Sequence, residues 1–526
     1  MTELLPTKAA YLFGESVEIE VRGASAETEA AVYHLGDEVA RIAITDDALI
    51  RLPELQPGGY RVELGTASTA IEITDSVRAR LRYGFVVDYS PGRDVTAVGD
   101  LVRRLHLTGV QFYDWAYRHA GLLAGGEEYH DALGQPVSLD TVRRLVDTVR
   151  AAGSRSFGYA AVYAVGPDAW PVWQHDALLT SSGAPYGLGD FLFLVDPAAS
   201  DWLEHFTTGL RSSIESVGFD GFHLDQYGYP KVALRADGEV VDVAESFVTL
   251  IDATRAALPD AHLVLNNVND FPTWRTAGLA QDAVYIEPWD PQVTLGSLAR
   301  VVDRARSVAG GKPVVLAAYQ HVYDTADAAA SDRATRLTMA TLFSHGATQL
   351  LAGEADRILV DPYYVRNHVV EDSTAQMLVR WYDFLVEYDE LLMSPEIVDV
   401  TASFAGRYND DANISFDDIP VSSEAVAGAV WRRITRAGDR LVIHLINLVG
   451  QDDTLWDSAR HPFADTGEGT LRLRAVGGFV PRVRVADPDN GGRLSDVVVS
   501  VDGDYASASL PKLEAWQVVV IELVPR

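Results

Sequence analysis

The sequence of 526 residues contains no cysteine. This absence excludes disulfide bonds, cysteine-ligated zinc and a thiol nucleophile. The sequence also lacks an apolar run long enough for a membrane helix, and its first residues show no basic segment followed by an apolar one. If Met1 is the natural start, these absences predict a cytoplasmic protein with no membrane partner.

Positive charge is scarce, with 43 Lys and Arg against 75 Asp and Glu and a net charge of −32. A surface this acidic repels nucleic acid and anionic lipid, so we expect neither as a partner. Solubility explains the charge better than attraction of a cationic substrate does. A glycine-rich phosphate loop is absent, and the Asp and His residues show no ligand spacing, so we predict no cofactor and no metal.

The pattern of apolar residues changes twice along the chain and predicts a multidomain protein. Residues 1–78 contain short alternating strands and turns, which predict an immunoglobulin-like β-sandwich with a structural role. Residues 79–393 alternate apolar strands with amphipathic helices, which predicts a central (β/α)₈ TIM barrel. Residues 394–526 are again rich in strands and predict a C-terminal antiparallel β-sandwich.

The barrel strands are predicted from apolar runs bounded by turn residues, and a long loop at 166–192 follows the third strand. We expect a helix after each strand, which makes eight strand-plus-helix units. The predicted strands are 82–89, 110–115, 156–165, 220–224, 262–267, 283–287, 313–319 and 348–352.

Carboxylate, amide and aromatic side chains gather where these strands end, and that end of a barrel carries the active site. Aromatic faces stack on sugar rings, and carboxylates and amides bind hydroxyl groups, so the mixture indicates a carbohydrate substrate. For His223 the alternative is a satisfied core histidine, and for Asp88 and Asp114 a salt-bridged scaffold. The predicted substrate-binding residues are Asp88, Tyr89, Asp114, Trp115, Tyr117, Arg118, His119, Tyr163, His223, Gln226, Asn267, Asp270, Trp289, Asp290, Tyr319 and Glu354.

Asp225 and Glu287 form the strongest candidate catalytic pair, because they end strands that lie two βα units apart. Retaining glycosidases need two carboxyl groups about 5–5.5 Å apart, one as nucleophile and one as acid/base. Apolar neighbours should raise the pKa of Glu287, whereas His223 and Gln226 should favour ionised Asp225. The alternative is that one carboxylate only binds substrate or a structural cation.

Four segments carry a family resemblance: FYDWAYRH at 112–119, DGFHLDQYG at 220–228, NNVN at 266–269 and YIEPW at 285–289. Together with the sandwich–barrel–sandwich order, they resemble glycoside hydrolase family 66, which holds dextranases and cycloisomaltooligosaccharide glucanotransferases. The resemblance implies action on α-1,6-linked glucans with retention. It also implies that Asp225 is the nucleophile and Glu287 the acid/base.

The chain departs from that family in lacking a secretion signal and an inserted carbohydrate-binding module. These departures predict linear or cyclic isomaltooligosaccharides as substrates in preference to dextran. Two other interpretations stay open. One is a transglycosylase that forms cyclic or longer isomaltooligosaccharides, and the other is a non-catalytic glucan-binding protein.

Overall fold

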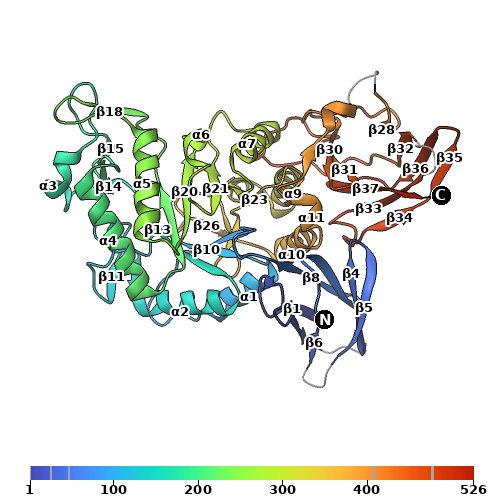
Figure 1. The fold of residues 1–526 in the computed structure, drawn as a ribbon, viewed down its shortest axis with the longest axis horizontal. Coiled ribbons are helices and arrows are strands. Elements are labelled where there is room, and N and C mark those ends of the chain that lie inside the picture. Colours follow the sequence, from blue (N-terminus) through green and yellow to red (C-terminus); the bar gives the residue numbers. More distant parts are fainter. Residues whose placement is uncertain (1, 24–26, 45–47, 405–408, 475–478, 526) are drawn as a thin grey trace.

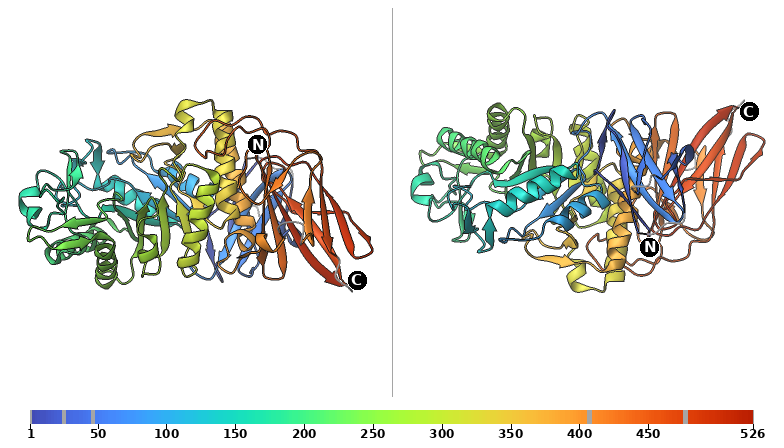
Figure 2. Two further views of the ribbon diagram at one scale, coloured as in Figure 1. Left: turned by 90° about the horizontal axis from the view of Figure 1, so that it is seen from above. Right: turned by 90° about the horizontal axis from the view of Figure 1, so that it is seen from below.

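A computed structural model describes residues 2–23, 27–44, 48–404, 409–474 and 479–525 of this multidomain protein. The molecule is elongated, with the helix-rich part at one end and two β-rich parts side by side at the other (Figures 1 and 2). Within the described residues, no helix has both the length and the apolar character needed to cross a membrane.

The N-terminal part consists of two sheets that enclose one small core. Alternating side chains such as Ile19, Val32, Ile50 and Val62 are fully buried between the sheets. Two sheets over one core are what a β-sandwich requires, while the immunoglobulin type and the domain limits at 78 and 393 stay predictions. The sheet orders are β1 (Glu3–Pro6), β3 (Glu18–Arg22), β6 (Leu49–Arg51), and β2 (Tyr11–Leu12), β8 (Ala67–Thr74), β7 (Gly58–Leu64), β4 (Glu29–His34), β5 (Asp37–Ala43).

The central sheet contains eight neighbouring parallel strands in chain order. They are β9 (Tyr83–Val86), β10 (Gly109–Phe112), β13 (Arg155–Ala161), β17 (Gly221–Asp225), β20 (His262–Val268), β21 (Ala283–Glu287), β22 (Val314–Leu316) and β23 (Thr348–Gln349).

The last parallel segment contacts strands at both ends of this series. β23 pairs with β22, and two residues later β24 (Ala352–Gly353) pairs in parallel with β9. Two antiparallel strands, β25 (Arg357–Leu359) and β26 (Asn367–Val369), extend the sheet beyond β24. The segment 348–353 therefore pairs with β22 through β23 and with β9 through β24.

The helices that cover the sheet bury one apolar face each. In α4 (Ser200–Val217), Trp202, Phe206 and Leu210 recur at four-residue spacing and are buried. The other long helices are α1 (Thr96–Arg104), α2 (Leu139–Ala151), α5 (Val243–Ala257), α7 (Leu295–Val308), α9 (Ala328–Ser344) and α10 (Asp372–Glu387), with the short α11 (Asp389–Leu392) after α10.

Two sequence predictions need correction here. The β20–β21 connection contains only the four-residue α6 (Thr273–Thr276), so one of the eight expected strand-plus-helix units lacks a long helix. The predicted loop at 166–192 includes the helix α3 (Trp170–Trp173), and β15 (Gly187–Leu188) and β16 (Leu192–Leu194) form a small sheet with β14 (Ala164–Val165). Glycine and proline in this segment mark turns between short elements.

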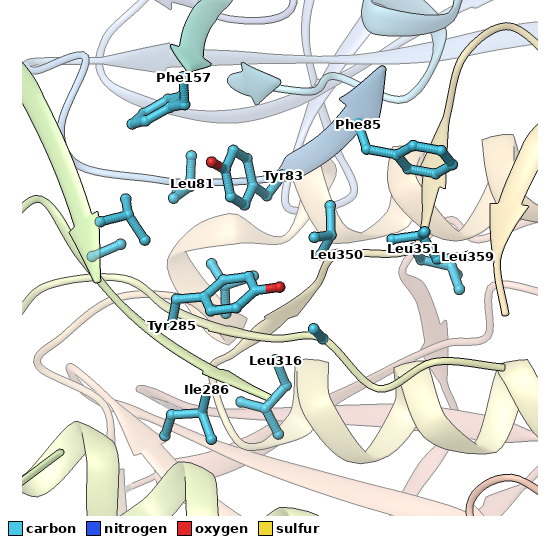
Figure 3. Packing of buried hydrophobic residues seen from close by; sticks show 14 of the residues in the cluster. Leu81, Tyr83, Phe85, Phe157, Tyr285, Ile286, Leu316, Leu350, Leu351 and Leu359 are labelled. Atoms are coloured by element: carbon cyan, nitrogen blue, oxygen red, sulfur yellow. The ribbon is translucent and has the colours of Figure 1, made fainter. Parts of the chain in front are cut away.

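Large buried side chains from non-adjacent strands of the central sheet pack against one another. Figure 3 shows Tyr83 of β9 and Tyr285 of β21 within this cluster, together with Phe85, Phe157 and Leu316. The centroids of the two tyrosine rings lie 6.1 Å apart, and the ring planes are at 88° to each other. These side chains are buried and belong to one large cluster of apolar residues.

The C-terminal part also contains two sheets over one core. The predicted hairpin is confirmed, since β30 (Val430–Ala437) pairs antiparallel with β31 (Arg440–Asn447). The other strands of its sheet are β27 (Val398–Asp399), β29 (Val421–Ser422), β33 (Phe479–Ala486), β34 (Ser495–Val497) and β37 (Trp516–Pro525). The second sheet has β28 (Ala412–Ser415), β32 (Gly469–Arg474), β35 (Val499–Asp502) and β36 (Tyr505–Leu510).

Helix α10 contacts all three parts of the molecule. Its Asp383 accepts a hydrogen bond from the backbone nitrogen of Ala70 in β8, at 2.9 Å. On the C-terminal side, the indole of Trp381 donates to Asp489 at 3.0 Å and packs 5.7 Å from the ring of Trp516. The helix therefore holds the flanking β-rich parts against the central sheet.

Candidate active site

Two carboxylates lie at the same edge of the central sheet. Asp225 is the last residue of β17 and Glu287 is the last residue of β21, and β20 runs between these two strands. Because all three strands are parallel, their carboxyl ends meet at one edge. The fold thus brings together the two residues that the sequence indicated as a pair.

A single amide nitrogen joins the two carboxylates. Asn266 of β20 donates through Nδ2 to Asp225 Oδ1 at 2.8 Å and to Glu287 Oε2 at 2.7 Å. Since both oxygen atoms lie within 2.8 Å of one nitrogen, their separation is less than twice that distance. This upper bound agrees with the spacing of about 5–5.5 Å between the two carboxyl groups of retaining glycosidases.

Each carboxylate has a second donor, which is a tyrosine hydroxyl. Tyr159 of β13 donates to Asp225 Oδ2 at 2.7 Å, and Tyr319 donates to Glu287 Oε1 at 3.1 Å. Both oxygens of each carboxyl group are therefore held before any substrate is present. Such fixed geometry lowers the cost of orienting the reacting groups.

The pKa values of both carboxyl groups are raised. Burial raises the pKa of Asp225 to about 6, against the opposing hydrogen bonds of Asn266 and Tyr159. Burial, followed by the charge of Asp225, raises the pKa of Glu287 to about 7. Glu287 therefore holds its proton to a higher pH than Asp225, and the expected raised pKa of Glu287 is confirmed.

The hydrogen bonds of Asp225 were expected to favour its ionised form. That prediction was wrong, because burial outweighs the hydrogen bonds and raises the pKa. His223 does not donate to Asp225: Nδ1 of this buried histidine lies 3.3 Å from the hydroxyl of Tyr83, and burial lowers the His223 pKa to about 3. The Gln226 side chain donates to the carbonyl oxygens of Asn266 and Phe271, each at 3.0 Å. Gln226 therefore favours ionised Asp225 through its backbone and not through its side chain, in addition to Asn266 and Tyr159.

A cavity of about 290 Å³ opens over the two carboxylates. Six of the predicted substrate-binding residues line it together with the pair: Asp114, His119, His223, Gln226, Trp289 and Tyr319. Burial, with the charges of Asp131 and Asp225, raises the pKa of Asp114 to about 8, and burial lowers that of His119 to about 4. Both side chains are therefore neutral near pH 7 and serve as hydrogen-bonding groups.

Aromatic residues that the sequence analysis did not select form much of the cavity wall. They come from several strands and loops: Tyr113, Tyr159, Phe191, Tyr227, Tyr229, Tyr285, Tyr363 and Tyr364. Apolar ring faces beside carboxylates and amides suit a sugar ring with its hydroxyl groups.

Four predicted residues lie in the packed interior and do not line this cavity. The Trp115 indole donates to the Tyr159 carbonyl at 3.1 Å, and the Tyr89 hydroxyl donates to the carbonyls of Val86 and Tyr113. Tyr163 donates to the Tyr229 carbonyl at 2.7 Å, and Asn267 donates to the carbonyls of Leu265 and Tyr285. These side chains satisfy backbone groups and so support the site from behind.

Four further residues, although at strand ends, also point elsewhere. Arg118 lies 4.1 Å over the ring of Tyr117 and donates to the His130 carbonyl. Asp270 pairs with Arg304, and Asp290 is exposed. None of these side chains lines the cavity over Asp225.

Asp88 and Glu354 line a separate cavity of about 380 Å³ at the ends of β9 and β24, as does Tyr89. Glu354 accepts from the backbone nitrogen atoms of Val87 and Asp88 and pairs with Arg93. Its carboxylate thus fixes the chain that leaves β9.

The register between β17 and β20 explains why Asn266, which was not among the predicted substrate-binding residues, belongs to the site. His223 pairs with Val264, so Asn266, two residues after Val264, shares the face of Asp225, two residues after His223. Asn267 consequently faces the other way.

Among the described residues, no group of His, Asp or Glu has the arrangement needed to hold a metal ion.

Two carboxyl groups of unequal pKa beneath a cavity lined by aromatic side chains are typical of a glycoside-active enzyme. The sequence matches glycosyl hydrolase family 66 over residues 6–520, and the chain therefore belongs to this family. The family resemblance seen in the sequence is confirmed.

The chain is similar to two curated relatives. It is 20% identical over 699 residues to a cycloisomaltooligosaccharide glucanotransferase from Niallia circulans, covering 98% of this chain and 71% of the relative. It is 23% identical over 540 residues to a dextranase from Streptococcus salivarius, covering 87% of this chain and 64% of the relative. The chain thus spans about two thirds of the length of the curated relatives that it matches.

A solved structure shows the same fold at low sequence identity. The cycloisomaltooligosaccharide glucanotransferase of Paenibacillus sp., complexed with cycloisomaltoheptaose, superimposes with a TM-score of 0.86. The match is 18% identical and covers 99% of this chain and all of that one. The likeness extends over the central sheet and both β-rich parts.

Proposed function

We propose that the chain is a retaining glycoside hydrolase that cleaves α-1,6-glucosidic linkages. Its substrates are linear or cyclic isomaltooligosaccharides, or dextran. The observation that carries the proposal is the Asn266 amide nitrogen shared by Asp225 and Glu287. The relatives named dextranase and cycloisomaltooligosaccharide glucanotransferase support the choice of linkage.

In the first step, Glu287 gives its proton to the departing glycosidic oxygen, and Asp225 attacks the anomeric carbon. The C–O bond to the leaving sugar breaks as the bond to the Asp225 carboxylate forms. The raised pKa of Glu287, about 7, supports its role as the acid, and the lower value of Asp225, about 6, supports its role as the nucleophile.

In the second step, ionised Glu287 removes a proton from water, and the water oxygen attacks the anomeric carbon. Asp225 leaves as a carboxylate, so two displacements restore the original configuration. The hydrogen bonds from Asn266 and Tyr159 stabilise the returning negative charge on Asp225.

We further propose that the central sheet is a closed (β/α)₈ barrel. The parallel pairings of β23 with β22 and of β24 with β9 support closure, since residues 348–353 contact both ends of the strand series. The position of Asp225 and Glu287 at carboxyl ends of strands agrees with the place of active sites in such barrels.

A second candidate is transglycosylation, in which a sugar hydroxyl replaces water in the second step. The relatives named glucanotransferases favour it. Both reactions share the first step and differ only in the acceptor.

Incubation with linear isomaltooligosaccharides, cyclic ones and dextran, followed by mass spectrometry, tests the proposal. Shorter linear products from one of these indicate hydrolysis, and new cyclic or longer products indicate transglycosylation. Asp225→Asn and Glu287→Gln keep side-chain shape and should each lower kcat by about 10³-fold or more. Near wild-type activity of Asp225→Asn would refute the nucleophile assignment, and binding without turnover would indicate a glucan-binding protein.

A further inference from the structure

A second, larger cavity lies at the opposite end of the central sheet from the carboxylate pair. Its volume is about 520 Å³. Val314, the first residue of β22, and Thr348, the first residue of β23, line it, whereas Asp225 and Glu287 are last residues of their strands. Tyr83 and Tyr285 pack in the cluster of buried residues that Figure 3 shows.

Three structural parts meet at this cavity. Residues 79–82 lead from the N-terminal sandwich into β9, and Asp303, Arg306 and Ser307 belong to α7. Pro395 and Ile397 follow α11, and the C-terminal sheets contribute Asp399 of β27 and Arg433 of β30. A ligand in this cavity would therefore contact the junction of the central sheet with both flanking parts.

Basic side chains dominate the cavity, although the chain carries a net charge of −32. The lining contains Arg80, Arg82, Arg306, Lys312 and Arg433, and its acidic residues are Asp303 and Asp399.

Most of this charge is already paired. Arg80 pairs with Asp389 at 2.6 Å, and Arg82 pairs with Glu72 at 2.6 Å. Arg433 pairs with both acidic residues of the cavity, Asp399 at 2.9 Å and Asp303 at 3.4 Å. These four carboxylates are therefore already ion-paired with Arg80, Arg82 and Arg433. The remaining cations of the lining are Arg306 and Lys312.

Arg306 and Lys312 have carbonyl partners only. Arg306 donates to the carbonyls of Gly346 and Ser394, each at 3.0 Å, and Lys312 donates to the Ala277 carbonyl at 2.9 Å. Within the described part of the chain, neither side chain forms an ion pair. Burial lowers the pKa of both side chains, and the charge of Arg433 adds to the effect at Arg306. The charges of Asp303 at Arg306 and of Asp282 at Lys312 act in the opposite direction but do not outweigh it.

We propose that this cavity binds a phosphate group, either as free phosphate or as a phosphorylated small molecule, through Arg306 and Lys312. A guanidinium binds phosphate oxygens with paired N–H donors, and an ammonium adds a point charge. The volume of the cavity accommodates an organic body attached to the phosphate. Because Arg306 also bonds to Ser394, the bound anion stabilises the connection between α7 and the segment that leads to the C-terminal sheets.

Thermal unfolding of the full chain tests the proposal. Inorganic phosphate and a hexose monophosphate are titrated separately, each against sodium chloride at matched ionic strength. We expect at least one of them to raise Tm by roughly 2 °C or more when it is in large excess over its Kd. A larger shift with the hexose monophosphate assigns the site to a phosphate ester, and an equal shift assigns it to free phosphate.

Variants locate the site. Lys312→Gln and Arg306→Gln should each reduce the phosphate affinity measured by calorimetry by about tenfold or more. Arg300→Gln, at an exposed position of α7 outside the cavity lining, should leave that affinity unchanged. If wild-type Tm and calorimetry show no effect beyond that of chloride, the proposal fails. It also fails if folded Lys312→Gln binds phosphate as tightly as Arg300→Gln does.

Discussion

Asp225 and Glu287 accept hydrogen bonds from the same nitrogen atom, at 2.8 Å and 2.7 Å. An amide nitrogen carries two hydrogen atoms, so Asn266 can give one to each carboxyl group. Its Oδ1 is buried with no partner among the described residues. The two carboxylates therefore orient the amide, and the amide in turn fixes the distance between them.

Asn266→Ala should lower kcat by roughly 10- to 100-fold, because each carboxylate loses a hydrogen bond to a charged group. Asn266 hydrogen bonds lower the pKa of both Asp225 and Glu287. Both limbs of the pH–rate profile should therefore move to higher pH. Steady-state kinetics over a pH series measures both effects. A lower kcat with an unmoved pH profile would contradict this positioning role.

The pH optimum should lie between about 6 and 7, the raised pKa values of Asp225 and Glu287. Below this window Asp225 gains a proton and loses its nucleophilic form. Above it Glu287 loses the proton that it must donate. A profile of kcat/KM against pH checks this, and a flat profile from pH 4 to 9 would exclude the pair as the titrating groups.

A substrate with a leaving group that needs no protonation, such as a nitrophenyl glucoside, provides a control for this profile. When Glu287→Gln acts on this substrate, the rate of glycosyl-enzyme formation should no longer fall at alkaline pH. The acid limb, which reports Asp225, should remain. Loss of the acid limb instead would reverse the two assignments.

The sequence predicted the strands of the site more accurately than the direction of their side chains. β21 was predicted with its observed bounds of Ala283–Glu287, because a short apolar run ends there on a carboxylate and proline. The third strand was predicted to reach residue 165, but β13 ends at Ala161, where it pairs with Asp225. That pairing depends on a distant segment, so the local pattern led to Tyr163 and missed Tyr159.

Burial at the strand ends was the other property that the sequence could not provide. Trp115 and Trp289 both follow strands, yet Trp115 is fully buried whereas Trp289 is 42% exposed at the cavity. The same limitation applies to Asp225, because the direction of its pKa shift depends on how far the surrounding strands remove it from water. Residue type alone indicated a carbohydrate site, and the packing determined which aromatic rings reach it.

Phe191→Ala should raise KM for an isomaltooligosaccharide by about 3- to 10-fold with little change in kcat. Phe191 lines the cavity, is 41% exposed and contacts neither carboxylate through a hydrogen bond, so its ring offers a stacking face alone. Phe13→Ala is the matched control, since Phe13 is 44% exposed in the N-terminal part and lies outside the cavity. Equal KM values for the two variants would show that Phe191 does not contact substrate.

Trp381→Ala should destabilise the protein by about 3–5 kcal/mol, because it removes a fully buried indole from α10. The indole donates to Asp489 and packs against Trp516, so its loss also leaves the half-buried Asp489 carboxylate with one donor fewer. Chemical denaturation monitored by fluorescence and circular dichroism measures the change. Trp274→Ala is the control, since Trp274 is 60% exposed and should cost less than about 1 kcal/mol. If both variants unfold at the same denaturant concentration, α10 does not hold the C-terminal sheets in the way its contacts indicate.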